Sequence, residues 1–286
     1  MLITKINDDG SLGAWVGTTD LPEPRKRHVV TALGDSLYVL GGAGVNGVER
    51  STTAFSVRVL ADAGTTSFQT LPTLSFGVFD SVACRTNQRL YVFSPSTDAV
   101  NIATIQSSRI GAWVPQDGLT SGTLTWYGSQ AIVGDHAFWF GPGTRAMTAK
   151  IGANGTLEAW KAIAATPVGA SNAIPQVVTV GQRLYLVGTS SDTSSGSNLV
   201  YVADVGTDGA LGAWQQVEPF PVPRYQYRAL AHDGFIYVLG GLGDADGKAL
   251  SSVYFTKTKS DGTLDLWQEA TSLPEWRTYE YGVVTP

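Results

Sequence analysis

The sequence predicts an all-β chain built from repeated units, and three observations support this fold class. A short apolar phrase of the type "LYVLGG" occurs five times in the 286 residues. An aromatic residue that follows a glycine-containing turn occurs six times, at intervals of 45 to 54 residues. Apolar and β-branched runs alternate with segments rich in Gly, Ser and Thr, and no stretch keeps a helical period over three turns. Two independent markers with nearly the same period indicate a repeat architecture.

Each unit is expected to contain four strands. In the first unit they cover residues 28–33, 36–42, 51–60 and 66–72. A Gly-Asp turn joins the first two strands, and Pro72 ends the last strand because proline has no N–H to donate. Four-stranded units of about 50 residues, joined by loops, pack radially as the blades of a β-propeller.

The number of strands predicts six blades, one of them incomplete. First strands are expected near Arg25, Val78, Thr125, Asn172, Arg224 and Arg277. Third strands are expected near Leu2, Thr52, Asp98, Arg145, Leu199 and Ser252. Second strands number five, because the chain stops at "YEYGVVTP", where the next apolar phrase would begin. We therefore expect a single domain over residues 1–286, with a sixth blade shared by the two termini and lacking its second strand.

An empty second-strand position would leave strand edges unpaired in the sixth blade. Each missing ladder bond forgoes roughly 0.5–1.5 kcal/mol, and open edges invite other chains. A protein partner or a neighbouring copy is therefore expected to supply a strand by β-augmentation. The alternatives are a three-stranded sixth blade closed by a parallel contact, and a chain that is a fragment of a longer protein.

The recurring aromatic residues are predicted to be structural wedges in the core. A buried aromatic ring removes roughly 150–250 Å² from water, which is a large contribution to packing. The fourth strands are expected to carry these markers: Trp15, Phe68, Trp113, Trp160, Trp214 and Trp267.

Two segments identify a resemblance to a known family. "LPEPRKRHVVTALGDSLYVLGG" at 21–42 and "FPVPRYQYRALAHDGFIYVLGG" at 220–241 resemble the kelch repeat in their Pro-Arg opening, apolar strands and double glycine. The "DGSLGAW", "TDGALGAW" and "SDGTLDLW" turns are similar to the galactose-oxidase-type kelch repeats of bacterial surface proteins and some phage proteins. The resemblance covers nearly the whole chain and implies a six-bladed kelch-like propeller. It implies no particular activity, because propellers host many unrelated functions.

Departures among the repeats indicate a candidate ligand site. Charged and aromatic residues at the Pro-Arg position cluster in blades one, five and six, which become neighbours when the ring closes. Arginine offers bidentate contacts and aromatic rings offer stacking faces, so this sector suits a sugar or an anionic group. The alternative is that these Arg and His residues tie neighbouring blades together. The candidate ligand-binding residues are Arg25, Arg27, His28, Arg224, Tyr225, Tyr227, Trp276, Arg277, Tyr279 and Glu280.

Composition and motifs argue against several functional classes. The net charge of -5 disfavours nucleic acid, since phosphate binding needs a positive field. Apolar runs fall far short of the roughly 20 residues that cross a bilayer, and no signal-peptide pattern is present. No metal or cofactor is expected, because His28, His136 and His232 lack metal-ligand spacing and no phosphate loop occurs. His232 is expected in a solvated loop, and Cys84, the only cysteine, is expected as a small buried strand residue.

The function expected from these observations is non-catalytic binding or assembly. We expect a bacterial surface or phage structural protein that recognises a receptor and binds a glycan or a protein partner. Low lysine content and abundant Ser, Thr and Gly favour a virion or cell-surface location over the cytoplasm. The alternative is a sugar-processing enzyme resembling kelch-type sialic acid mutarotases, which would use Arg25, Arg224, Arg277 and Glu280.

Overall fold

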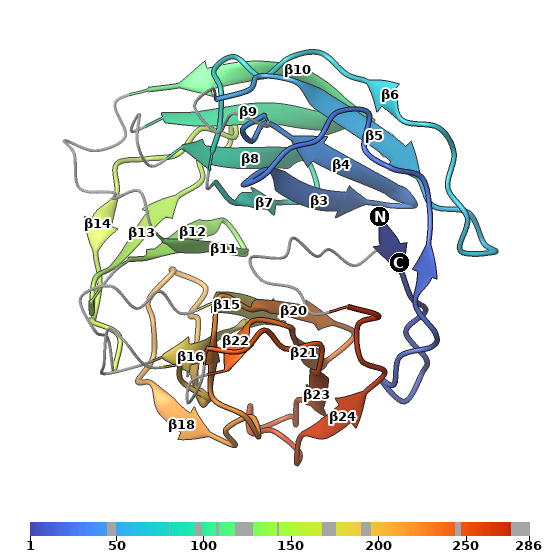
Figure 1. Cartoon of the computed structure of the whole chain (residues 1–286). Coiled ribbons are helices and arrows are strands. Elements are labelled where there is room, and N and C mark those ends of the chain that lie inside the picture. Colours follow the sequence, from blue (N-terminus) through green and yellow to red (C-terminus); the bar gives the residue numbers. More distant parts are fainter. Residues whose placement is uncertain are drawn as a thin grey trace.

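The computed structural model is a ring of antiparallel sheets with no helix among the residues that it describes (Figure 1). These residues are 1–44, 50–79, 81–94, 99–106, 109–117, 128–141, 143–167, 176–189, 196–243 and 247–275. Five four-stranded sheets form the blades, so the prediction of an all-β propeller is confirmed. Over the same ranges, no helix is long and apolar enough to span a membrane.

The blades follow one another along the chain, each with its strands in sequence order. Blade 1 contains β3 (Val29–Leu33), β4 (Ser36–Leu40), β5 (Ala54–Arg58) and β6 (Gln69–Thr70). Blade 2 contains β7 (Ala83–Arg85), β8 (Arg89–Ser94), β9 (Ala99–Gln106) and β10 (Arg109–Gln116). Blade 3 contains β11 (Ser129–Val133), β12 (His136–Phe140), β13 (Ala146–Lys150) and β14 (Lys161–Ala162). Blade 4 contains β15 (Gln176–Val180), β16 (Arg183–Thr189), β17 (Leu199–Asp204) and β18 (Gln215–Val217). Blade 5 contains β20 (Arg228–His232), β21 (Phe235–Leu239), β23 (Val253–Lys257) and β24 (Gln268–Ala270).

Two short sheets complete the described structure. At the N-terminus β1 (Leu2–Ile3) pairs with β2 (Val16–Gly17), and in blade 5 β19 (Arg224–Tyr225) pairs with β22 (Leu242–Gly243). The first strands of the blades lie innermost, because contacts join β3 to β7, β7 to β11, β11 to β15 and β15 to β20 (Figure 1).

First strands begin after the Pro-Arg positions near which they were predicted, although the range 28–33 predicted for the first unit agrees with β3 to within one residue. In blade 1, β3 starts at Val29, four residues after Arg25, and in blade 5 β20 starts at Arg228. The Pro-Arg segment forms a separate loop, because a positive φ at Arg27 (57°) and at Gln226 (55°) turns the chain before the strand begins.

The aromatic markers also lie slightly outside the positions predicted for them. Five of the six immediately precede the fourth strand, and only Trp113 lies within one, the long β10. Trp160 packs edge-on against Phe93 of blade 2 at a ring separation of 6.1 Å. Trp214 contacts Phe140 of blade 3 in the same way, at 5.9 Å. These tryptophans therefore lie between consecutive blades, each against the blade that precedes its own.

The N-terminal segment lies between blade 5 and blade 1. On the blade 5 side, the Trp15 indole N–H donates to the Thr271 carbonyl oxygen (3.0 Å), and the Thr271 hydroxyl donates to the Leu12 carbonyl oxygen (2.6 Å). On the blade 1 side, Met1 and Phe68 pack against the same buried residues, Ala32, Leu37 and Val57. Residues 1–17 thus lie between blades 5 and 1. The inner strand predicted after Arg277 lies outside the described residues, so the six-bladed count and the shared blade stay predictions.

Candidate functional site

The Pro-Arg loops of blades 1 and 5 are built in the same way. In blade 5 the loop strand β19 pairs with β22, just after the double glycine. In blade 1 the corresponding contact is an antiparallel bridge between Lys26 and Ala43. The second glycine permits this close approach, because a Cβ at Gly42 (φ 92°) would lie 2.8 Å from both the His28 Cβ and the Lys26 carbonyl oxygen.

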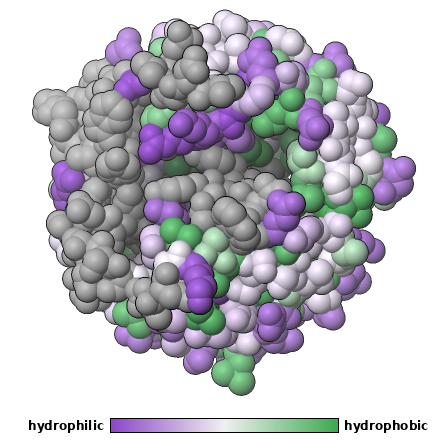
Figure 2. Space-filling view, viewed as in Figure 1, coloured by the Kyte–Doolittle hydropathy of each residue, from purple (hydrophilic) through white to green (hydrophobic). Residues whose placement is uncertain are grey.

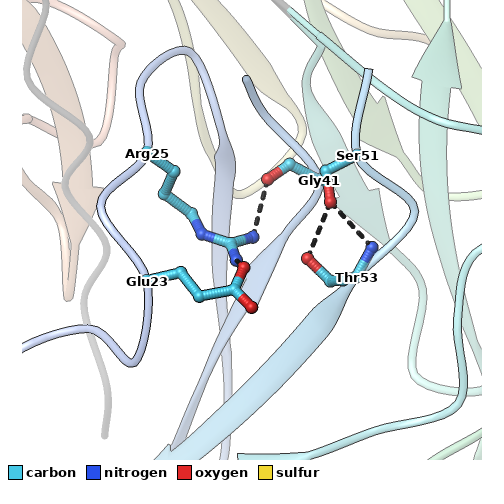
Figure 3. A network of polar contacts seen from close by, with 5 residues as sticks. All are labelled: Glu23, Arg25, Gly41, Ser51 and Thr53. Carbon is cyan, nitrogen blue, oxygen red and sulfur yellow. Dashed lines mark hydrogen bonds and ion pairs between the residues drawn. The ribbon is translucent and has the colours of Figure 1, made fainter. Parts of the chain in front are cut away.

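Arg25 ties its loop to the end of β4 (Figure 3). Its Nη1 donates to the Gly41 carbonyl oxygen at 2.8 Å, and its Nη2 lies 3.0 Å from Oε2 of Glu23. The guanidinium carbon also stands 4.6 Å from the centroid of the Phe55 ring. Burial lowers the pKa of Arg25, and the Glu23 carboxylate opposes that change. The side chain is therefore part of the fold of blade 1.

Arg224 makes the equivalent contact in blade 5. Nη1 donates to the carbonyl oxygens of Gly240 (2.8 Å) and Ser252 (3.2 Å), and Nη2 donates to Ser252 Oγ (3.0 Å). The residue is only 1% exposed, and burial lowers the pKa of Arg224. Each arginine binds the blade that its own loop enters. The side chains of Arg25 and Arg224 therefore do not make the expected tie between neighbouring blades, because each binds its own blade. The backbone of Arg224 does make such a tie, since it forms an antiparallel bridge with Ser197 of blade 4.

Tyr227 does join two blades. Its buried hydroxyl donates to the Val187 carbonyl oxygen of β16 at 2.7 Å, and burial raises the pKa of this phenol. His28 holds the same place in blade 1 and is half-buried. Burial, with a smaller contribution from the Arg25 charge, lowers the pKa of His28 to about 4. His28 is therefore neutral at physiological pH.

Between the buried arginine and the following His or Tyr, two residues of each loop are less buried. Lys26 and Arg27 are exposed in blade 1, and Tyr225 and Gln226 are partly buried in blade 5. The Arg27 guanidinium carbon lies 4.6 Å from the ring centroid of Phe79, in the segment that leads into blade 2. Sequence reasoning missed Phe79, because a cation–π contact between loops of two blades has no local sequence signature.

The remaining candidates of the site belong to other segments. Trp276, Arg277, Tyr279 and Glu280 lie outside the described residues. Two of the three predicted blades therefore contribute described residues, from the loops at 23–28 and 222–228. Glu23 was also missed as a site residue, although its position two residues before Arg25 was the available clue.

The residues considered for metal or nucleophile chemistry are dispersed. Cys84 is half-buried, and burial raises the pKa of its thiol to about 12, so it is protonated at neutral pH. His136 is buried, with Nδ1 2.8 Å from Oδ1 of Asp135. The prediction of a loop position for His232 is wrong, since this residue ends β20. Over the described ranges, no group of three His, Cys, Asp or Glu side chains could hold a metal ion.

An open groove lies between blades 4 and 5, on the side of the strand turns rather than of the Pro-Arg loops. It has a volume of about 430 Å³ and is lined by residues that include Arg183, Asp204 and Lys259. Arg183 Nε lies 2.7 Å from Asp204 Oδ1, and Lys259 Nζ lies 3.3 Å from Asp265 Oδ1. These charges already pair within the chain, so the groove presents little free charge to a ligand.

Comparison with known proteins extends this description. No protein-family model matches the chain. Over 118 residues it is 29% identical to human Kelch-like protein 38, covering 40% of this chain and 18% of that protein. Over 120 residues it is 30% identical to human Kelch repeat and BTB domain-containing protein 13, covering 41% of this chain and 24% of that protein. The aligned part is thus at most a quarter of either relative.

A solved structure described as "Structure of YjhT" shares the fold. It aligns with a TM-score of 0.64 over 93% of this chain and 89% of its own, at 12% identity. Identity this low speaks for the fold alone. The kelch-protein relatives and the two Pro-Arg/double-glycine loops show that this chain is similar to kelch-repeat proteins, and the solved structure shows that it shares a fold with a known protein.

Proposed function

We propose that the chain is a non-catalytic binding and assembly module that holds a protein partner on the face formed by its Pro-Arg loops. Kelch-repeat propellers are typically protein-binding modules, and the relatives of this chain are kelch proteins. A ring of blades suits this role, because each blade offers loops on a rigid frame.

The observation that carries the proposal is that each Pro-Arg loop combines a buried, hydrogen-bonded arginine with less buried residues. Arg25 and Arg224 are held by backbone carbonyl oxygens, so they fix the loop and are not offered to a ligand. Lys26 and Arg27, by contrast, are exposed on a loop held by Arg25. Preorganised loops bind with a smaller entropic cost than flexible ones. Two basic side chains on a fixed loop suit an acidic surface of a partner.

The finer identity of the partner is part of the same proposal. We propose a receptor-recognition or structural role on a bacterial surface or a phage particle, with a glycan or a protein as ligand. Arg27 stacked on Phe79 supports either ligand, because carboxylates and sugar rings both use such a pair. Figure 2 shows hydrophilic side chains beside the centre of the ring on the face in view, which fits a polar interface.

A sugar-processing enzyme of the mutarotase type is the weaker candidate. It would need Arg224 to reach the substrate, yet this side chain is 1% exposed and its Nη atoms already bind Gly240 and Ser252. An anomer-exchange assay with sialic acid separates the two candidates, since the proposed binding module leaves the uncatalysed rate unchanged.

Binding through the Pro-Arg face is tested with a matched pair of variants. Arg27→Gln removes the exposed charge and keeps a residue type that tolerates positive φ in the equivalent loop, as Gln226 does. Arg58→Gln removes an exposed charge from the opposite end of blade 1. In a glycan array and a screen of surface proteins, ligands retained by the wild type should be lost by Arg27→Gln and kept by Arg58→Gln. Equal retention by both variants would contradict the proposal.

A further inference from the structure

The inner edge of β1, which faces away from β2, differs from the same edge of the third strand in every described blade. Third strands β5, β9, β13, β17 and β23 pair with a second strand on one side and a fourth strand on the other. In the part of the chain that the structure describes, β1 pairs only with β2. The Thr18 N–H donates to the Met1 carbonyl oxygen (2.9 Å), which makes Met1–Thr18 a hydrogen-bonded pair. Because such pairs alternate, the N–H and C=O of Leu2 point towards the inner edge.

The side chain of Leu2 is less buried than its counterparts in blades 1, 3 and 4. Leu2 corresponds to Phe55, Met147 and Tyr201, which are 5%, 7% and 8% exposed, and to the partly buried Tyr254 of blade 5. Leu2 itself is only partly buried. It therefore keeps apolar surface that an incoming strand could cover.

A glycine rule describes how second strands meet the next blade. The turn between the third and fourth strands has a positive-φ glycine at Gly10, Gly155, Gly209 and Gly262. An added Cβ there would collide with the first residue of the preceding second strand: Phe235, Arg89, His136 and Arg183, respectively. Glycine is thus required wherever a bulky first residue arrives.

The third residue of the second strand completes the contact. Tyr237 donates its hydroxyl to the Gly10 carbonyl oxygen at 2.9 Å. Tyr91 does the same to Gly155 (2.9 Å), and Tyr185 to Gly262 (3.0 Å). A phenol at this place in the strand therefore recognises the backbone of the turn in the next blade.

A strand paired with the inner edge of β1 would contact the turn of blade 1, and this turn departs from the glycine rule. The turn has Ala63 at the equivalent place, with a φ of 63°. Alanine adopts this conformation less readily than glycine does, and it puts a Cβ where the turns at Gly10, Gly155, Gly209 and Gly262 have none. A strand beside β1 therefore meets a turn that excludes a bulky first residue.

We infer that the inner edge of β1 accepts an extended strand from a protein partner, with a small residue first, a tyrosine third and apolar residues between and after them. The inference rests on the proposed binding function, because it states how a partner attaches. The five second strands of the chain supply the template, and Ala63 selects the small first residue. Backbone pairing with Leu2 gives affinity, and the first residue gives specificity.

Two peptides test the inference directly. One has the sequence of residues 36–42, "SLYVLGG", which begins with a small residue, and the other carries the Ser36→Phe change. Each is extended at its C-terminus by two lysines for solubility and a fluorophore for anisotropy. The wild-type chain is expected to bind the serine peptide at least tenfold more tightly than the phenylalanine peptide.

Two variants of the chain locate the binding. Ala63→Gly removes the Cβ and suits the positive φ, so it should reduce the difference between the peptides to less than twofold. Leu2→Pro removes the N–H that points to the inner edge and should abolish binding of both peptides. Leu2→Val keeps that N–H and is the matched control. Near-UV circular dichroism verifies that each variant is folded.

Several outcomes would overturn the inference. Failure of both peptides to bind the wild type is one. Equal binding of the two peptides, or retained binding by folded Leu2→Pro, is another. The assay needs no natural partner, so its failure leaves the Arg27→Gln test unaffected. Failure of the Arg27→Gln test likewise leaves peptide binding measurable.

Discussion

Arg224 donates a 2.8 Å hydrogen bond from Nη1 to the Gly240 carbonyl oxygen, and Arg25 makes the same 2.8 Å bond to Gly41. The Pro-Arg opening and the double glycine of the kelch-type repeat are therefore joined by a direct hydrogen bond. This contact fixes the loop whose exposed residues we propose for binding.

Loss of the Arg224 side chain should destabilise the protein. Arg224→Ala leaves the Gly240 carbonyl oxygen without its arginine donor and removes one of the two donors to the Ser252 carbonyl oxygen, so we expect about 2–4 kcal/mol lower free energy of unfolding. Arg58→Ala is the control, since its side chain is 58% exposed and lies 3.6 Å from Asp35, and it should change stability by less than about 1 kcal/mol. Urea denaturation measures both. Equal effects would contradict a structural role for Arg224.

The wedge position of Trp160 predicts a large packing effect. Trp160 is 7% exposed and lies against Phe93 of the preceding blade, so Trp160→Ala should lower stability by about 3–5 kcal/mol. Val114→Ala, at a side chain 62% exposed on β10, should stay within about 0.5 kcal/mol of the wild type. Thermal unfolding of the two variants compares them. An unchanged melting temperature for Trp160→Ala would refute the wedge assignment.

His28 should make stability depend on pH between about 4 and 6.5. Its pKa is about 4 in the folded chain and near 6.5 when unfolded, so the unfolded state binds more protons within this window. Its contribution is therefore fully present above pH 6.5 and is lost as the pH falls towards 4. His28→Gln should flatten the curve of unfolding free energy against pH in this window. If His28→Gln leaves the slope unaltered, the pKa of His28 is not lowered in the folded state.

Asp261 should contribute to stability as long as its carboxyl group is ionised. Its Oδ1 accepts from the Thr263 N–H (2.9 Å) and the Thr263 hydroxyl (2.7 Å), and these hydrogen bonds lower the pKa of the carboxyl. The contribution is present above the unfolded pKa of about 3.9 and is lost as the pH falls below it. Asp261→Asn should be tolerated at pH 7, because Asn154 accepts the same two bonds from Thr156. Asp261→Ala should be less stable than Asp261→Asn, which differential scanning calorimetry measures. Equal stability of the two variants would show that the hydrogen bonds to Thr263 do not stabilise the turn.

Much of the architecture could be predicted because its causes are local. Alternation of apolar and polar residues defines each strand, and glycine turns separate the strands, so five second strands were found at their correct places. The Pro-Arg positions near which first strands were predicted lie about four residues before β3 and β20, although the range 28–33 predicted for the first unit starts only one residue before β3. The positive φ at Arg27 and Gln226 delays these strands, and neither residue type announces that conformation.

The all-β repeat, its period and the residues of the Pro-Arg loops could be predicted from the chain, since they depend on neighbours in sequence. The roles of those residues depend on the three-dimensional arrangement of the blades. Arg224 is buried and Arg27 exposed because the loop folds back onto its own blade, a reversal that depends on contacts between Tyr225 and Leu242, 17 residues apart in sequence. The role of Ala63 likewise depends on the arrangement of the blades. The residues that an added Cβ would meet at the corresponding glycines come from the preceding blade. Contacts between residues distant in sequence leave no periodic pattern in the chain.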